Sequence, residues 1–116
     1  MAKAISIMLA REGFGVSVNE LFVAGQKPLQ ILQNTLKDST VLELRDCTVD
    51  ELLYYIDQGT PVFARTGANQ AILLTGYSSN KVNYYDPATK KAKSADYDEI
   101  EEIFQQGGNY FIAYVK

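Results

Sequence analysis

The sequence predicts an α+β fold in which N-terminal helices pack on a mostly antiparallel sheet. Two observations support this prediction. Apolar residues recur at helical spacing early in the chain, where Ile5, Met8 and Leu9 share one face. Extended apolar runs separated by turn-forming residues then dominate residues 59–87. With 116 residues, 47% of them hydrophobic and 22% charged, the chain is expected to form a single domain, residues 1–116.

The expected helices are bounded by start and stop signals. Pro28 suits the first position of a helix. Ser17 with Glu20, and Thr48 with Glu51, have the spacing of capping boxes. Glycines follow the apolar faces and end the helices. These signals predict helices over residues 2–12, 18–23, from 28 to about 36 and over 49–58, and a last one that carries Ile100, Ile103 and Phe104.

Short runs of apolar, β-branched and aromatic residues predict the strands. They cover residues 41–44, 61–65, 70–77, 81–85 and 110–115. Two of these runs are separated only by Ser78, Ser79 and Asn80, which indicates a hairpin. The segment 88–93 is expected to be a polar, solvated turn because it carries Lys90, Lys91 and Lys93.

The hairpin is predicted to have a three-residue loop. Side chains alternate between the two faces of a strand, so an odd loop places Gln70 and Asp86 on one face. Three-residue loops usually end in the left-handed region, so Asn80 is expected at positive φ with a bulge beside it. Leu73 and Tyr85 would be cross-strand neighbours on the opposite face. The face of Gln70 would present four further residues to the first helix: Ile72, Leu74, Val82 and Tyr84.

Three segments of this stretch resemble the C-terminal half of C39-like cysteine peptidases, which have the papain-like fold. They are Gly-Thr-Pro-Val-Phe-Ala at 59–64, Asn-Gln-Ala-Ile-Leu-Leu-Thr-Gly-Tyr at 69–77 and Val-Asn-Tyr-Tyr-Asp-Pro at 82–87. Nearer the start, Gly-Phe-Gly-Val-Ser at 13–17, followed by Glu20 and Leu21, resembles the family's Gly-x-x-Val-Ser stretch. The resemblance implies a papain-like, C39 peptidase-like domain over most of the chain.

The resemblance also implies where a catalytic site would lie. In the family, the strand that runs into Thr-Gly-Tyr begins with the catalytic His, and the Asp of the later Asp-Pro orients it. Here Gln70 stands at the His position, and Asp86, 16 residues on, matches the orienting acid. The nucleophilic Cys would fall at about residue 1 or just before it, and the Gln of the oxyanion hole further upstream. The chain is therefore interpreted as a degenerate member without a catalytic Cys and His, and Gln70 and Asp86 are called its relic pair.

The chemistry of the candidate residues argues against catalysis. The side-chain amide of Gln70 does not titrate and cannot take a proton from a thiol, although it donates and accepts hydrogen bonds. Either Gln70 and Asp86 bond each other, or the relic pair belongs to a site that still binds a ligand. Cys47 is the only thiol, and its place just before a helix would lower its pKa. It does not match the family nucleophile and no His exists to pair with it, so a structural role is expected.

Composition excludes several function classes. A net charge of −3 leaves no basic footprint for nucleic acid. With no His, one Cys and no second carboxylate at ligand spacing to Asp86, no metal or cofactor is expected. No apolar run reaches the ~20 residues that span a bilayer.

The expected function is that of a catalytically inactive C39-like domain that serves as a peptide- or protein-binding or structural module. Some transporter-linked members of the family lack the nucleophile and bind the exported polypeptide. The resemblance therefore implies a bacterial surface or export protein as the context, with an extracellular or membrane-associated place if the chain is part of a longer one. Two alternatives stay open: a truncated cysteine peptidase domain whose nucleophile lies upstream, and a module that forms a homodimer.

Overall fold

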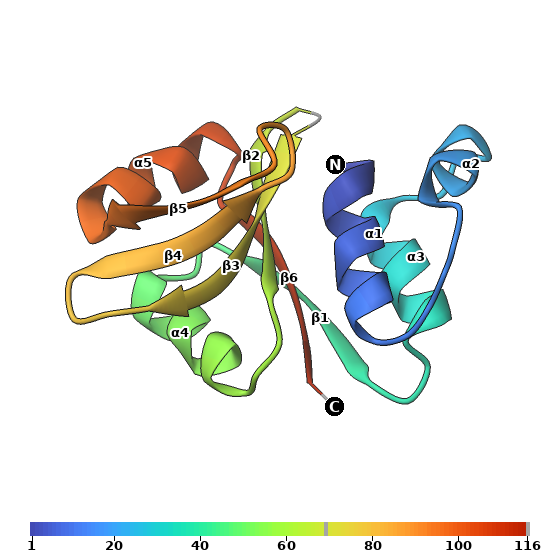
Figure 1. The fold of residues 1–116 in the computed structure, drawn as a ribbon, viewed down its shortest axis with the longest axis horizontal. Coiled ribbons are helices and arrows are strands. Elements are labelled where there is room, and N and C mark those ends of the chain that lie inside the picture. Colours follow the sequence, from blue (N-terminus) through green and yellow to red (C-terminus); the bar gives the residue numbers. More distant parts are fainter. Residues whose placement is uncertain (69, 116) are drawn as a thin grey trace.

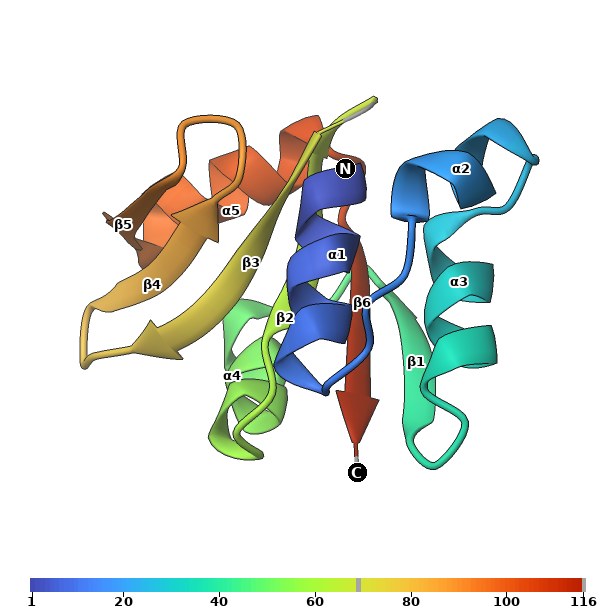
Figure 2. The ribbon, with the colours of Figure 1, turned by 45° about the vertical axis from the view of Figure 1, so that its right-hand side comes forward.

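The computed structural model describes residues 1–68 and 70–115. A six-stranded antiparallel sheet with the strand order β1-β6-β2-β3-β4-β5 runs through its middle. Helices cover both faces, α1 to α3 on one side and α4 and α5 on the other (Figures 1 and 2). The predicted α+β fold is confirmed. The elements are α1 (Ala2–Arg11), α2 (Val18–Val23), α3 (Pro28–Thr35), β1 (Thr40–Arg45), α4 (Val49–Asp57), β2 (Val62–Gly67), β3 (Gln70–Tyr77), β4 (Lys81–Asp86), β5 (Lys91–Asp96), α5 (Tyr97–Gln106) and β6 (Tyr110–Val115).

The first core lies between α1 to α3 and the sheet. Helix α1 turns its apolar face inward, so that Ala4, Ile5, Met8 and Leu9 are fully buried. The sheet contributes alternate residues to this core: Phe63, Ala71, Leu73, Ile112 and Tyr114. Hydrophobic burial of this face holds the start of α1 against β3.

The second core lies between the other face of the sheet and α4 and α5. It contains Ile72, Leu74 and Val82, with Tyr84 packed against it. The expectation that these residues face the first helix is therefore wrong. Both faces of β3 are apolar because helices cover both, and α1 packs on Ala71 and Leu73 instead. Leu73 does pair with Tyr85 on the α1 side, as predicted.

The β3–β4 hairpin differs from its prediction at the loop. Tyr77 pairs with Val82, and the Ser78 N–H donates to the Lys81 carbonyl at 2.8 Å, which leaves the two-residue turn Ser79–Asn80. The three-residue loop is thus wrong, and Asn80 is not among the described non-glycine residues at positive φ. The ladder shifts register between Leu74 and Gly76, so the extra residue lies at Thr75. This bulge offsets the even loop and restores the predicted pairing toward the other end of the hairpin.

The helix starts follow local chemistry to different degrees. The Thr48 hydroxyl accepts from the Glu51 N–H at 3.3 Å and the Glu51 carboxylate accepts from the Thr48 N–H at 3.2 Å, which confirms this capping box. Helix α2 begins where predicted, but the Ser17 side chain makes no capping hydrogen bond. The backbone ψ of Ser17 is 82°, whereas the capping residue Thr48 has an extended ψ of 162°. The predicted capping box at Ser17 and Glu20 is therefore wrong.

The lysine-rich segment after the hairpin is only partly a turn. Lys90 lies in the left-handed region, at φ 58°, within the tight connection. Lys91 and Lys93 belong instead to strand β5, which pairs with β4 from Lys91 opposite Asp86 to Asp96 opposite Lys81. The prediction of a polar turn over residues 88–93 is therefore wrong for its second half. Lysines on an edge strand discourage pairing with another chain.

Candidate functional site

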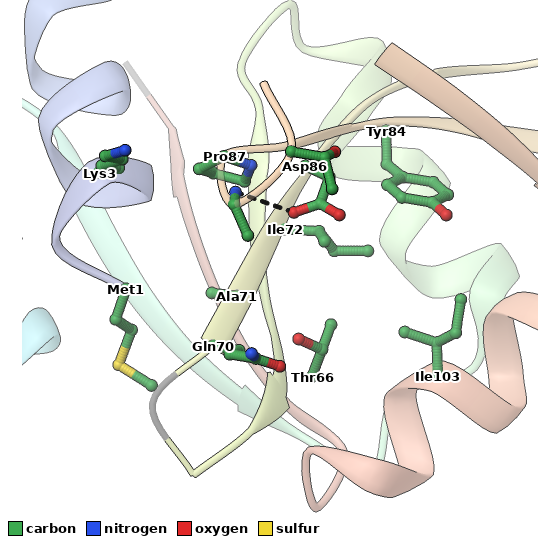
Figure 3. Close-up of a pocket in the computed structure, with 12 residues that line it drawn as sticks. Met1, Lys3, Thr66, Gln70, Ala71, Ile72, Tyr84, Asp86, Pro87 and Ile103 are labelled. Atoms are coloured by element: carbon green, nitrogen blue, oxygen red, sulfur yellow. Dashed lines mark hydrogen bonds between the residues drawn. The ribbon is translucent and has the colours of Figure 1, made fainter. Parts of the chain in front are cut away.

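A cleft of about 450 Å³ opens where the start of α1 meets the β3–β4 hairpin (Figure 3). We call it the α1–hairpin cleft. Both members of the relic pair line it, Gln70 at the first position of β3 and Asp86 at the last position of β4. Its other lining residues come from α1 (Met1 and Lys3), the sheet (Thr66, Ala71, Ile72 and Tyr84), the β4–β5 connection (Pro87, Ala88 and Thr89) and α5 (Ile103).

Register brings the relic pair to one side of the hairpin. The pairing of Leu73 with Tyr85 continues by one residue to place Asp86 beside Ile72, and Gln70 is two residues before Ile72 on the same strand. Figure 3 shows Asp86 above Ile72 and Gln70 below it, both beside the open space. The predicted shared face of Gln70 and Asp86 therefore holds, although the loop that was expected to produce it does not.

The carboxylate of Asp86 is held by its own turn rather than by Gln70. Its Oδ1 accepts from the Ala88 N–H at 3.0 Å, and its Oδ2 lies 3.5 Å from the Lys93 Nζ. Among the described residues, no hydrogen bond joins Gln70 to Asp86, so the two do not form a closed pair. The amide of Gln70, on an exposed residue, faces the cleft as a donor and acceptor.

The lining of the cleft combines two kinds of surface. Ile72 is buried and Ile103 and Tyr84 are half-buried, which provides an apolar wall. Gln70, Thr66 and Asp86 add hydrogen-bonding groups. A few polar groups set in an apolar concavity suit the recognition of a ligand that has both apolar side chains and amide groups.

Cys47 lies away from this cleft. It lies between β1 and α4 and lines a different hollow together with Phe104 of α5. Burial and the carboxylates of Glu51 and Asp46 raise the pKa of the Cys47 thiol, so the expectation of a lowered pKa is wrong. Burial is the larger cause of this rise in pKa, and the two acidic side chains add to it. At neutral pH the thiol is the form that this site favours, and it donates weakly to the Arg45 carbonyl at 3.8 Å.

Sequence reasoning missed several lining residues. Ile103 and Lys3 reach the cleft from helices that are far apart in the chain. Their periodicity marks them as helical, but only the packing of both helices on the sheet brings them to Gln70. The one available signal was the family resemblance, which implied a site near residue 1.

Two further searches cover the described residues 1–68 and 70–115. No three side chains of the His, Cys, Asp and Glu types lie close enough there to hold a metal ion. In the same residues, no helix has the length and apolar character that crossing a membrane requires.

Comparisons with known proteins support the fold alone. No protein-family model and no curated protein matches the sequence. Among solved structures, the chain is similar to a crystal structure from Bacillus anthracis that is provisionally described as a C39-like peptidase. The TM-score is 0.82 and the sequence identity 16%, and the match covers 99% of this chain and 87% of that one. This structural neighbour and the predicted fold therefore agree.

Proposed function

We propose that this domain is a catalytically inactive C39-like module that binds a peptide or protein segment in the α1–hairpin cleft. The observation that carries the proposal is the place of Gln70. It lines the cleft together with Asp86 and the start of α1, where the family resemblance puts the catalytic base. A cysteine peptidase needs a base that takes the proton of its thiol, and a glutamine amide cannot do so.

The remaining chemistry supports the same proposal. The 116 residues contain no His, and their single Cys lies in another hollow, where its thiol pKa is raised. No described group is thus placed to form a thiolate beside Gln70. The cleft keeps the features that binding requires: an apolar wall and a glutamine amide that can donate to and accept from the backbone of an extended segment.

Two measurements test this proposal. The first is hydrolysis of a diverse peptide mixture, for which we expect no specific cleavage. Cleavage that a thiol reagent blocks would contradict the inactive assignment. The second is selection of binding peptides from a displayed library, followed by titration of the best peptide against variants.

The variants are chosen to isolate the cleft. Gln70→Ala and Tyr84→Ala are expected to weaken binding of the selected peptide, because each removes a group that lines the cleft. Gln33→Ala is the matched control, since Gln33 is exposed on α3. Unchanged affinity in Gln70→Ala and Tyr84→Ala would place the binding surface elsewhere.

The two alternatives make different predictions. The truncated-peptidase alternative predicts hydrolysis once an upstream nucleophile is supplied; because Gln70 provides no base, we expect no hydrolysis in that experiment. A dimerisation module would have a solution mass twice the 12.9 kDa of the chain. Sedimentation measurements therefore separate a homodimer from the peptide-binding module.

A further inference from the structure

Two arginines and one tyrosine form a row across three neighbouring strands. Arg45 of β1 pairs directly with Tyr110 of β6, and Arg65 of β2 lies on the other side of β6. The guanidinium carbon of Arg45 is 4.8 Å from the centre of the Tyr110 ring, and that of Arg65 is 5.0 Å from it. The ring thus holds a cation on each flank. We call these three residues the arginine row.

The row concentrates positive charge in an acidic protein. The chain has a net charge of −3 and its only arginines are Arg11, Arg45 and Arg65, so two of its three guanidinium groups lie in the row. Cation–π attraction to the tyrosine face offsets the repulsion between them. In the part of the chain that the structure describes, the carboxylate in contact with them is that of Glu43, which accepts from the Tyr110 hydroxyl at 2.9 Å. Two cations facing one carboxylate leave the row positive.

Contacts within the fold orient the guanidinium group of Arg65 firmly and that of Arg45 in part. Arg65 Nε donates to the Gly107 carbonyl at 2.7 Å, at the end of α5. Arg45 Nε lies 3.6 Å from the Glu43 carboxylate, while 60% of the Arg45 side chain stays exposed. A guanidinium has five N–H donors, so each group retains donors beyond these contacts. Pre-oriented donors bind a carboxylate with little further loss of side-chain freedom.

The row adjoins the α1–hairpin cleft. Thr66 lines the cleft, is half-buried and directly follows Arg65 on β2. Figure 2 shows that β6, which begins with Tyr110, starts at the same end of the sheet as α1. A segment that leaves the cleft past Thr66 toward β6 therefore meets Arg65 first and Tyr110 and Arg45 next.

We infer that the arginine row binds acidic side chains of the polypeptide segment that occupies the cleft. The inference rests on the proposed function and names the chemistry of its partner: a segment with carboxylates beyond its cleft-bound part. Neighbouring strands lie about 4.8 Å apart, so the backbones of Arg45 and Arg65, with β6 between them, are about 10 Å apart and the two side chains can receive separate carboxylates. Neither arginine belongs to the relic pair, so binding of acidic side chains by the row does not require Gln70 or Asp86.

The test uses the isotope-labelled domain and two probe peptides. One is an acetylated and amidated hexapeptide of alternating glutamate and alanine, and the other has glutamine in place of glutamate. Backbone and arginine side-chain NMR signals of Arg45, Arg65 and Tyr110 report on the row, and those of Gln70 and Asp86 report on the cleft. The peptides are added up to about 10 mM, which covers weak millimolar binding. Inorganic phosphate at the same concentration is a third probe.

We expect the glutamate peptide to shift the row signals saturably and the glutamine peptide not to do so. The double variant Arg45→Gln with Arg65→Gln should weaken glutamate-peptide binding about tenfold, since each lost charge-assisted bond at an exposed site contributes modestly. Arg11→Gln removes the same charge at the far end of α1 and serves as the matched control, with unchanged affinity expected. Circular dichroism confirms that each variant is folded.

Four results would overturn the inference, of which the first three need a detectable response. Those three are equal shifts with both peptides, unchanged affinity in the double variant, and a row that responds to phosphate but not to the glutamate peptide. Row signals that stay silent up to the highest concentration also overturn it, whatever the cleft signals do. The proposed function is tested separately. Library-selected peptides that leave the NMR signals of Gln70 and Asp86 unchanged would contradict it.

Discussion

Gly107, at the end of α5, is where we expect the smallest side-chain change to have the largest effect on stability. Gly107 is buried at φ −93°, a conformation open to any residue, so a local signal for glycine is lacking. A Cβ at this position would lie 1.8 Å from the Arg65 carbonyl oxygen and 2.8 Å from the Thr66 nitrogen. Both are backbone atoms of β2. In Gly107→Ala, the end of α5 and the strand must therefore separate by more than about 1 Å to reach ordinary contact distance.

The magnitude follows from what this separation disrupts. Overpacking against rigid neighbours costs about 1–3 kcal/mol, and loss of the bond from Arg65 Nε to the Gly107 carbonyl adds about 1–2 kcal/mol. We expect the free energy of unfolding to fall by roughly 2–5 kcal/mol, with a drop in Tm of roughly 8–20 °C. Urea unfolding followed by circular dichroism measures this change.

Gly15→Ala is the matched control for that experiment. Its Cβ would meet no atom within 4 Å, and its φ lies outside the left-handed region. The control should change the free energy of unfolding by no more than about 0.5 kcal/mol. A loss below about 1 kcal/mol in Gly107→Ala would refute the close packing of α5 on β2.

Three further predictions concern the core, the thiol and one phenol. Leu73→Ala should lower the free energy of unfolding by about 2–5 kcal/mol, because Leu73 is 1% exposed in the α1 core, and a urea titration that shows only a few tenths would mean this face is solvated. Cys47→Ser should keep the fold and the affinity for a cleft-bound peptide, and loss of binding by a folded variant would move the site to the hollow beside α5. Burial and the Glu43 carboxylate raise the pKa of Tyr110 to about 12, so absorbance titration of the wild type should show a late-ionising phenol that Tyr110→Phe lacks. Because folding raises the pKa of Tyr110, the contribution of its protonated phenol to the free energy of unfolding is complete below the unfolded-state pKa near 10 and is lost as the pH rises toward 12. The wild type should therefore lose its stability advantage over Tyr110→Phe across this range, and an advantage that grows would contradict the assignment.

Element boundaries were predictable where the chain carries local signals. The structure places β3 at Gln70–Tyr77 and β6 at Tyr110–Val115, the same ranges as predicted, because apolar runs end there at turn formers. The capping box at Thr48 set the start of α4. Strand β5 lacks such a signal. Its sequence Lys-Ala-Lys-Ser-Ala-Asp has one buried residue, Ala95, and its strand character comes from backbone pairing with β4.

The candidate site was predictable in part. Spacing and the family resemblance brought Gln70 and Asp86 to one cleft. Alternation could not say which helix covers which face of β3, because residues 71 to 74 are all buried and apolar. The predicted odd number of loop residues was wrong for a related reason. The pattern of polar and apolar residues gives no signal for the bulge at Thr75. The arginine row depends on β6 entering between β1 and β2, which only long-range pairing decides.

That position of β6 has a consequence for how the chain acquires its structure. In the described part of the chain, β1 has one strand partner, β6, although 64 residues separate the end of one from the start of the other. Long-range closure of this kind is slow, since the entropy of a large loop is lost before any contact rewards it. During synthesis, β1 and the face of α3 that packs on it cannot complete their packing until residues 110–115 have emerged from the ribosome. Strand β1 and this face of α3 are therefore the part of the molecule that stays exposed longest to chaperones and proteases.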